Sequence, residues 1–407
     1  MSDETRVARL RANVTKLFWI RFFLNVRALA IVLPLFYVHR GLTLGQVFAL
    51  YVVWGIVLLF AEVPSSWLAD VWGRRPTIVL GAALFVLKDI IHLISYDFWG
   101  MLVANIVLGF ALACLSGTDE ALLYDSGREL GEESFSLSAL GKFSSAYHLP
   151  KIVTVLVGAF VADRLLEGEF MILLIIDMAA CVLAAIMAIR LTEPNHHIDL
   201  SEKRRGALRD AFELFVRDGA LRRIIYSRDF VFVPVFGLMI SFQVYFIGMG
   251  VSVVTIGVVW ALYHTVTYIL QRYIHEPAER MGLERTLNAM NLLIAGCFIL
   301  FFSLVLVGAP PLSQLIVMTI AVTLVISRFP VYSELINRRC HSYNRATTLS
   351  LANVFRGTVQ FILLSLSGVI ISQGFIWLFT LVCAVVLLGS FGFRLHRSFD
   401  QSPSPTI

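Results

Sequence analysis

The sequence predicts an all-α membrane protein with twelve transmembrane helices, in two six-helix halves that repeat one plan, and with both termini cytoplasmic. Three observations support this prediction. First, the chain has 407 residues, 58% of them hydrophobic and only 15% charged, and a soluble protein of this length could not bury so much apolar surface. Second, at about 20 residues for each span, the length holds about twelve helices. Third, the Lys and Arg residues lie mainly in alternate loops.

The first half, residues 1–191, is predicted to be a six-helix bundle. Each apolar segment is of membrane length and is separated from the next by a turn or a polar stretch, so each is interpreted as one span. The first span carries Arg21, Asn25 and Arg27, and Arg40 lies in the turn after it. The predicted spans are 17–38, 44–69, 77–96, 98–126, 137–161 and 170–189.

Residues 192–223 form the one long hydrophilic segment and are predicted to be a cytoplasmic linker. Within this segment Leu208, Ala211, Phe212 and Phe215 share one helical face, and charged residues occupy the other. This pattern predicts an amphipathic helix in the membrane interface, which would couple the two halves. A merely solvated linker is the alternative.

The second half, residues 224–397, repeats the plan and is followed by a tail, 398–407, that is expected to be disordered. Within it, the stretch PAERMGLER aligns with LADVWGRR of the first half, which places Gly282 on Gly73 and Glu279 on Asp70. The alignment predicts two structurally similar halves. The predicted spans are 224–248, 252–274, 286–307, 312–336, 346–371 and 375–393.

Basic residues in the loops predict the orientation. They recur in alternate loops and at the termini, whereas the opposite loops contain little besides Arg40 and Arg164. By the positive-inside rule both termini are cytoplasmic, so the number of spans is even. We expect no cleavable signal peptide, because the N-terminal residues are polar and the first apolar run continues to membrane length.

The charged turn between the second and third predicted spans resembles a known transporter signature. The turn reads LADVWGRR, and the major facilitator superfamily has the pattern Gly-x-Leu-Ala-Asp-Arg-x-Gly-Arg-Lys/Arg at this position. Ser66 and Val71 depart from the pattern. An ordinary loop on the positive side of the membrane is the alternative, which two arginines alone would satisfy. The matching residues are Leu68, Ala69, Asp70, Gly73, Arg74 and Arg75.

The resemblance extends further along the first half. The stretches RGLTLGQV, EVP–AD–GRR and TDEALLYDS together resemble a bacterial group within the superfamily, many members of which are taken to export drugs, metabolites or siderophores. Two features depart from the superfamily: Asn105 replaces the fourth-helix Arg, and only Gly158 survives from the Gly-rich run of antiporters. These departures weaken the prediction of drug–proton antiport, but not the prediction of transport.

The resemblance also implies a cytoplasmic latch made of Asp70, Gly73, Arg74, Arg75 and Asp125. In the superfamily Arg74 would bridge Asp70 to Asp125, which lies at the end of the fourth span. This latch would hold the outward-facing state shut on the cytoplasmic side.

Four ionisable residues in the cytoplasmic half of the spans are the predicted proton-coupling group: Glu120, Glu62, Asp119 and Arg21. An ionisable group inside hydrocarbon costs about 2.5–3.5 kcal/mol, so its presence indicates pairing, a water-filled cavity or function. A carboxylate in a partly dry site binds a proton more readily than it does in water. We therefore expect Glu120 to load and release protons as Arg21 changes partner. A permanent Arg21–Glu120 salt bridge that only holds helices together is the alternative.

A second polar set is predicted to line the substrate cavity. Its four basic residues outnumber the two acidic ones, which favours an anion or a zwitterion that bears a carboxylate. The alternative is structural pairing, for example between residues one helical turn apart such as Asp89 and His92. The set comprises Arg27, Asn25, Lys88, Asp89, Tyr124, Lys151, Asp177 and Arg356.

These features predict a secondary active transporter in a bacterial cytoplasmic (inner) membrane. We expect a proton-coupled exporter of a small organic compound, anionic or zwitterionic and similar to a siderophore, metabolite or drug. The expected partners are this small-molecule substrate, protons and the lipid bilayer, with no nucleic acid, cofactor or metal, and the chain is expected to be a monomer. A primary pump or an enzyme is not expected, because the sequence has neither a phosphate-binding loop nor a catalytic constellation. A proton-coupled importer of an organic anion and a transport-inactive membrane sensor are the alternatives.

Overall fold

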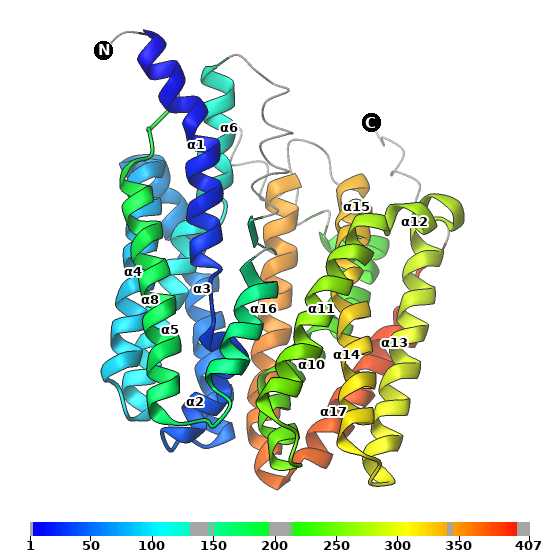
Figure 1. Ribbon diagram of the computed structural model, residues 1–407. Coiled ribbons are helices and arrows are strands. Elements are labelled where there is room, and N and C mark those ends of the chain that lie inside the picture. Colours follow the sequence, from blue (N-terminus) through cyan, green and yellow to red (C-terminus); the bar gives the residue numbers. More distant parts are fainter. Residues whose placement is uncertain are drawn as a thin grey trace. The chain divides into compact units, whose positions relative to one another are not determined.

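The computed structural model describes residues 3–130, 146–147, 150–194, 213, 215–339 and 345–396, and these form helices joined by short connections (Figure 1). Among the described residues, ten helices are long and apolar enough to cross a membrane. The chain divides into two compact units: Met1–Asp199 with Ser252–Ala261, and Leu200–Val251 with Leu262–Ile407. The count of twelve spans and the cytoplasmic termini stay predictions. Most of the predicted amphipathic helix and the tail at 398–407 lie outside the described residues.

The first unit contains helices α1 to α8 and a shorter apolar helix, Pro150–Val161. Helix α5 packs along α3 and α4, and α8 packs along α4 and α1. Apolar residues such as Leu17, Ile78 and Phe85 fill the core between these helices. The described elements are α1 (Asp3–Leu24), η1 (Leu29–Ile31), α2 (Leu33–His39), α3 (Leu44–Trp72), α4 (Arg74–Ile94), α5 (Phe98–Leu115), α6 (Thr118–Glu129) and α8 (Glu167–Ile189).

The first predicted span is broken rather than continuous. Helix α1 ends at Leu24, and the chain becomes helical again only at η1 and α2. Helix ends leave backbone groups without partners, and at membrane depth the protein itself must satisfy them. Asp177 of α8 does so here: its carboxylate accepts hydrogen bonds from the backbone N–H groups of Ala28 (2.6 Å) and Leu29 (3.2 Å). A specific contact therefore stabilises the break, which places residues 25–28 in a non-helical segment.

The fourth predicted span also has two parts, α5 and α6. They are joined at Gly117, whose φ of 75° lies in the left-handed region that favours glycine. The turn starts a new helix at Thr118, so Asp119 and Glu120 occupy the first turn of α6. Carboxylates are favoured at a helix N-terminus because the helix dipole is positive there.

The repeat predicted from the sequence has a counterpart in backbone geometry. Gly73 precedes α4 with φ 110° and ψ 154°, and Gly282 precedes α13 with φ 90° and ψ 148°. In both places a threonine hydroxyl four residues later donates to the glycine carbonyl, at 2.8 Å from Thr77 and 3.0 Å from Thr286. The two copies thus start a helix with the same glycine turn.

The second unit is built around α10, which packs against α16 and α17, while α13 packs against α14 and α17. Its core contains Leu221, Leu287 and Tyr332. The described elements are α10 (Gly219–Gly248), α11 (Val253–Tyr273), which continues from the first unit, α12 (His275–Met281), α13 (Leu283–Leu306), α14 (Pro311–Ser327), α15 (Phe329–Arg339), α16 (Arg345–Ile370), η2 (Ile371–Gln373), α17 (Phe375–Leu387) and the π-helix η3 (Leu388–Gly392).

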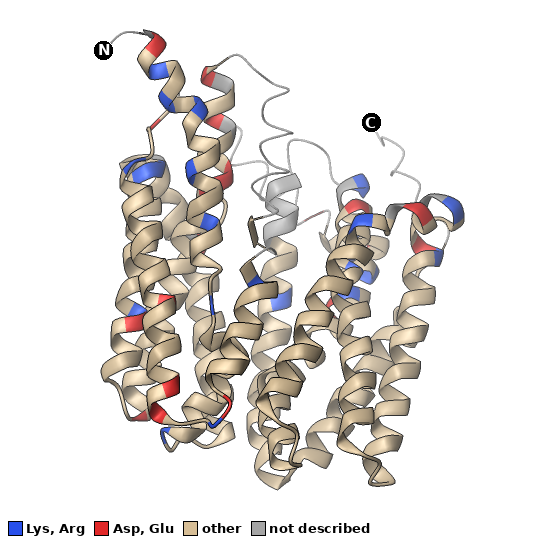
Figure 2. Ribbon diagram, viewed as in Figure 1, with Lys and Arg blue, Asp and Glu red and all other residues tan. Residues whose placement is uncertain are grey.

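Charged residues are unevenly distributed in each unit (Figure 2). In the first unit many lie near the start of α1 and the end of α6, and a smaller group lies near α2 and the start of α8. In the second unit they gather around α12 and α15. Charged groups inside the helical packing are therefore few.

Candidate functional site

The first unit contains a cavity of about 540 Å³, a size typical of small-molecule sites. Residues at helical spacing form its walls, because each helix turns one face toward it. From α3 these are Trp54, Leu58 and Glu62, each four residues after the last, and Phe85 comes from α4. The α1 residues in the wall are Leu17, Ile20, Arg21 and Leu24, and the others are Asn25, Arg27, Leu112, Leu115, Ser116, Gly117, Asp119, Glu120 and Tyr147.

One part of the wall joins a cation to two carboxylates. A guanidinium nitrogen of Arg21 lies 3.8 Å from a carboxylate oxygen of Asp119 and 3.6 Å from one of Glu120. The Asp119 side chain is 18% exposed and that of Glu120 is 56% exposed. One positive charge therefore lies near two negative charges, and Glu120 is the carboxylate that is more accessible to water.

A second cation lies in the non-helical segment after α1. Arg27 donates through Nε to the carbonyl of Leu24 at 3.0 Å, and its guanidinium carbon lies 4.7 Å from the centre of the Phe85 ring. Asn25 donates to the carbonyl of Arg21 at 2.8 Å. The side chains of Asn25 and Arg27 thus satisfy the last carbonyls of α1, and both also face the cavity.

The remaining polar residues of the wall are Glu62, Ser116 and Tyr147. The ammonium of Lys151 lies 3.3 Å from the centre of the Tyr147 ring, which is a cation–π contact. Lys151 thus contacts a residue of the wall but is not itself among the lining residues. The side chain of Tyr124, another predicted cavity residue, lies outside the described residues. Within the part of the chain that the structure describes, no group of three or more His, Cys, Asp or Glu residues could hold a metal ion.

Of the predicted cavity set, Asn25 and Arg27 line this cavity, and other members have different partners. Lys88 forms an ion pair with its neighbour Asp89, whose side chain is fully buried. Asp177 binds the backbone at the break in the first span. Arg356 belongs to the second unit, where it lies 3.1 Å from Asp229. The wall of this cavity contains two arginines and three carboxylates.

Comparison with known proteins identifies the family. A model of the Major Facilitator Superfamily matches residues 20–364. The chain belongs to the major facilitator superfamily. No curated protein matches it in sequence.

Solved structures of superfamily transporters share the fold. A mutant of the nucleoside transporter NupG superposes with a TM-score of 0.75 at 15% identity, covering 94% of this chain and 98% of the other. A D-xylose–proton symporter gives 0.72 at 12% identity, covering 98% and 100%. A bacterial homologue of the human lysosomal transporter Spinster gives 0.72 at 14% identity, covering 98% and 97%. Family and fold together indicate a multi-pass membrane transporter rather than an enzyme.

Arg74, in the superfamily turn between α3 and α4, forms an ion pair with Asp125 of α6. A guanidinium nitrogen of Arg74 lies 2.5 Å from a carboxylate oxygen of Asp125, and both side chains are about 15% exposed or less. Glu193, which follows α8, accepts hydrogen bonds from the backbone N–H groups of Arg74 (2.8 Å) and Arg75 (2.6 Å). This carboxylate satisfies the first N–H groups of α4. The side chain of Asp70, the other acidic member of the predicted latch, lies outside the described residues.

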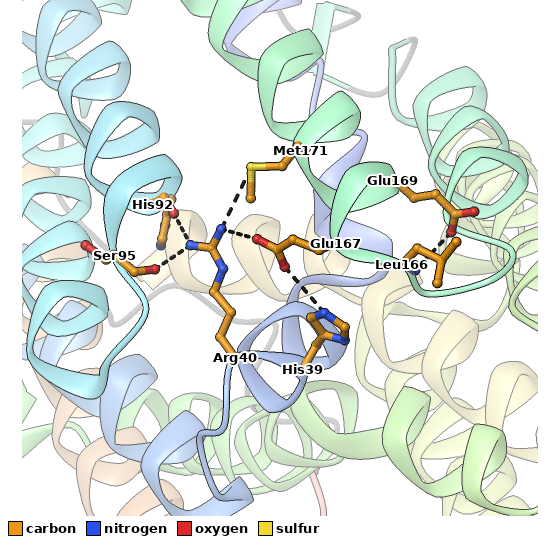
Figure 3. Close-up of polar contacts among 8 residues, drawn as sticks. All are labelled: His39, Arg40, His92, Ser95, Leu166, Glu167, Glu169 and Met171. Atoms are coloured by element: carbon orange, nitrogen blue, oxygen red, sulfur yellow. Dashed lines mark hydrogen bonds and ion pairs between the residues drawn. The ribbon is translucent and has the colours of Figure 1, made fainter.

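A second polar cluster, which the sequence analysis missed, surrounds Arg40 at the end of the first unit where α4 ends and α8 begins (Figure 3). Arg40 donates to the carbonyls of His92, at 2.5 Å, and Ser95, and its guanidinium lies 2.7 Å from Glu167. The Arg40 side chain is only 1% exposed. A cation suits the negative end of α4, and a carboxylate suits the positive start of α8. Arg40 thus ties together α4, α8 and the turn between α2 and α3.

The sequence held only a weak signal for this cluster. The loops on that side contain few basic residues, so each one that is present is a candidate for a specific contact. Arg164 is likewise a basic residue in a loop on that side, but its side chain is exposed and has no comparable set of contacts among the described residues. Sequence position alone does not separate the two residues.

Proposed function

We propose that the chain is a proton-coupled secondary transporter that exports a small organic compound across a bacterial cytoplasmic membrane. The observation that carries this proposal is the position of Arg21 between Asp119 and Glu120 on the cavity wall. One guanidinium balances the charge of only one carboxylate, so the three side chains together carry one net negative charge, which a bound proton removes. Proton binding then changes the charge that a substrate meets in the same cavity.

The exposures of the two carboxylates support distinct roles. Glu120 is the more exposed and exchanges protons with water, whereas the more buried Asp119 stays with Arg21 when Glu120 is protonated. In this scheme the Arg21 guanidinium pairs with Asp119 alone when Glu120 is protonated, and with both carboxylates when Glu120 is ionised. Glu62 provides a further carboxylate on the same wall.

The direction of transport is part of the proposal. The resemblance of the first half to a bacterial group of exporters supports export. One of the similar structures is a proton symporter, so proton-coupled import of an organic anion is the second candidate. The charge of the cavity wall alone does not distinguish the two directions.

Vesicle transport tests the proposal. Everted and right-side-out vesicles containing the chain are screened with a compound library for accumulation driven by an imposed pH gradient. We expect accumulation in everted vesicles, which corresponds to export from the cell. Glu120→Gln should abolish accumulation while retaining exchange of labelled for unlabelled compound, and Asp163→Asn, an exposed loop carboxylate, is the matched control.

Three outcomes would contradict parts of the proposal. If Glu120→Gln still concentrates the compound in proportion to the pH step, Glu120 is not the proton carrier. If the wild type accumulates nothing in either orientation, a transport-inactive sensor becomes the better explanation. Accumulation only in right-side-out vesicles would favour the importer.

A further inference from the structure

The cavity of the first unit presents two opposite charges that the described part of the protein does not neutralise. Arg27 forms no ion pair within the described residues: its guanidinium contacts the Leu24 carbonyl and the face of Phe85. Glu62, at the other side of the wall, has no side-chain hydrogen bond or ion pair within them. Arg21, the other cation of the wall, differs because it already has two carboxylates.

Leaving such charges without partners is costly, so their retention calls for an explanation. An isolated ionised group away from water loses much of its solvation, and a buried charge is normally paired. The two charges do not form an ion pair with each other. Both side chains are only partly buried and both line the same cavity. Water or a ligand in the cavity must therefore solvate them.

Packing contacts between α3 and α5 show which level of α5 lies beside Glu62 of α3. Val57 and the backbone of Leu58 in α3 pack against Gly109 of α5, and the Ser65 hydroxyl donates to the carbonyl of Ala113 at 2.9 Å. Glu62 lies between Leu58 and Ser65 in α3, so its level on α5 falls between those two contacts.

Arg27 lies at a similar level. Gly81 of α4 packs against the carbonyl of Ala111 in α5. Phe85, whose ring contacts the Arg27 guanidinium, lies one helical turn further along α4. A helical turn rises about 5.4 Å. The two charges thus lie within about two turns of each other along α5 and around one cavity, Glu62 on α3 and Arg27 in the non-helical segment after α1.

Most of the other residues of the wall are apolar or aromatic. Trp54 and Leu58 lie on the Glu62 face of α3, Phe85 supports Arg27, and Tyr147 adds a third ring. A cavity of about 540 Å³ with such walls suits a compact molecule with an aromatic body.

We propose that this cavity binds a compact aromatic zwitterion, with its anionic group against Arg27 and its ammonium against Glu62. The inference rests on the proposed function and names the substrate class of the same site. A zwitterion satisfies both charges at once, whereas a simple anion leaves Glu62 unpaired and a simple cation leaves Arg27 unpaired.

Matched ligand trios test this assignment with purified protein and no gradient. One trio shares an indole ring: tryptophan is zwitterionic, tryptamine is cationic and indole-3-propionate is anionic. The second shares a benzene ring: phenylalanine, phenethylamine and 3-phenylpropionate. Apparent affinity is measured by ligand-induced thermal stabilisation at millimolar concentrations. For at least one trio, the wild type should bind the zwitterion on the order of 10- to 100-fold more tightly than either singly charged member, because each of those forms one charge-assisted hydrogen bond fewer.

Two substitutions that preserve side-chain size approximately should each abolish the preference over one singly charged ligand. Glu62→Gln should weaken the zwitterion to the level of the anion while leaving the anion almost unchanged. Arg27→Gln should do the converse and leave the cation almost unchanged. The retained ligand in each case shows that the variant is folded. Asp163→Asn and Arg164→Gln, an exposed pair outside the cavity, are the controls and should keep the wild-type preference.

Several results would overturn the assignment. These are a wild-type preference for a singly charged member in both trios, no stabilisation by any member, or variants that weaken all three members equally. Failure here is distinguishable from failure of the proposed function, because this binding needs no gradient. Gradient-driven transport of a singly charged compound would leave the proposed function intact while refuting the zwitterion.

Discussion

Replacing Arg40 by methionine should strongly destabilise the first unit, because this one side chain connects three of its elements. The substitution removes hydrogen bonds to two carbonyls at the end of α4 and the ion pair with Glu167 at the start of α8. The guanidinium also lies 4.4 Å from the centre of the Phe36 ring and 4.1 Å from that of Tyr96. Methionine fills much of the same space without supplying any donor.

The magnitude follows from what the substitution leaves behind. Hydrogen bonds to a charged group contribute about 1.5–3 kcal/mol each, and loss of one member of a buried ion pair costs about 3–5 kcal/mol. Glu167 is 36% exposed and regains water when Arg40 is removed, which lowers the cost. The cost of burying the guanidinium also disappears. We therefore expect the free energy of unfolding to fall by about 3 kcal/mol, which corresponds to a fall in Tm of about 6–12 °C for a unit of this size.

Thermal unfolding of the purified protein in detergent measures this destabilisation. Arg164→Met is the control, because Arg164 is an exposed arginine at the same end of the unit. Arg40→Lys should fall between wild type and Arg40→Met, since an ammonium keeps the charge but not the planar fork that reaches several acceptors. A melting temperature for Arg40→Met within a degree or two of both wild type and control would refute the reasoning. The hydrogen bonds of the guanidinium would then only offset the cost of its burial.

Four further results are expected. Arg74→Ala and Asp125→Asn should be non-additive by about 0.5–3 kcal/mol in a double-mutant cycle on transport rate, because the two side chains form an ion pair; additive losses would mean independent topology signals. Gly158→Ala should lower Tm and expression, because its Cβ would meet the Ala28 carbonyl, whereas Gly168→Ala, which has open space, should not. Asp229→Asn should lower Tm by several degrees more than Asp163→Asn does, because it leaves Arg228 and Arg356 without their shared carboxylate; equal effects would argue against this role. Impermeant thiol labelling of intact cells should miss Cys340, outside the described residues, and label a Gly168→Cys variant; strong labelling of Cys340 would reverse the orientation.

The sequence predicts the continuous helices well because local information suffices for them. Apolar length and charged turns place the span at 44–69, and the structure has α3 at Leu44–Trp72. The repeat is likewise visible in the order of the residues, and Gly73 and Gly282 have matching backbone angles. At these positions the local sequence determines whether the chain forms a helix or a turn.

Features that depend on distant partners could not be predicted in the same way. Nothing near Asp177 in the chain indicates that its carboxylate binds the backbone at Ala28. Lys88 and Asp89 have the depth expected of cavity residues, yet the structure pairs them with each other. Grouping residues by depth gives their level in the membrane but not the face of the helix on which they lie. The face decides whether a charge lines the cavity or packs inside the unit.

The break in the first span has a consequence for how this protein enters the membrane. Its opening apolar segment carries two arginines, Arg21 and Arg27, and α1 is not among the ten helices apolar enough to cross on their own within the described residues. At about 2.5–3.5 kcal/mol for each charge, the segment is a poor substrate for the translocon by itself. The carboxylate that satisfies its open backbone arrives 149 residues after Ala28, on α8. A ribosome has therefore synthesised much of the first unit before the earliest span gains its full set of partners, and truncated chains that end before α8 should be recognised by membrane proteases.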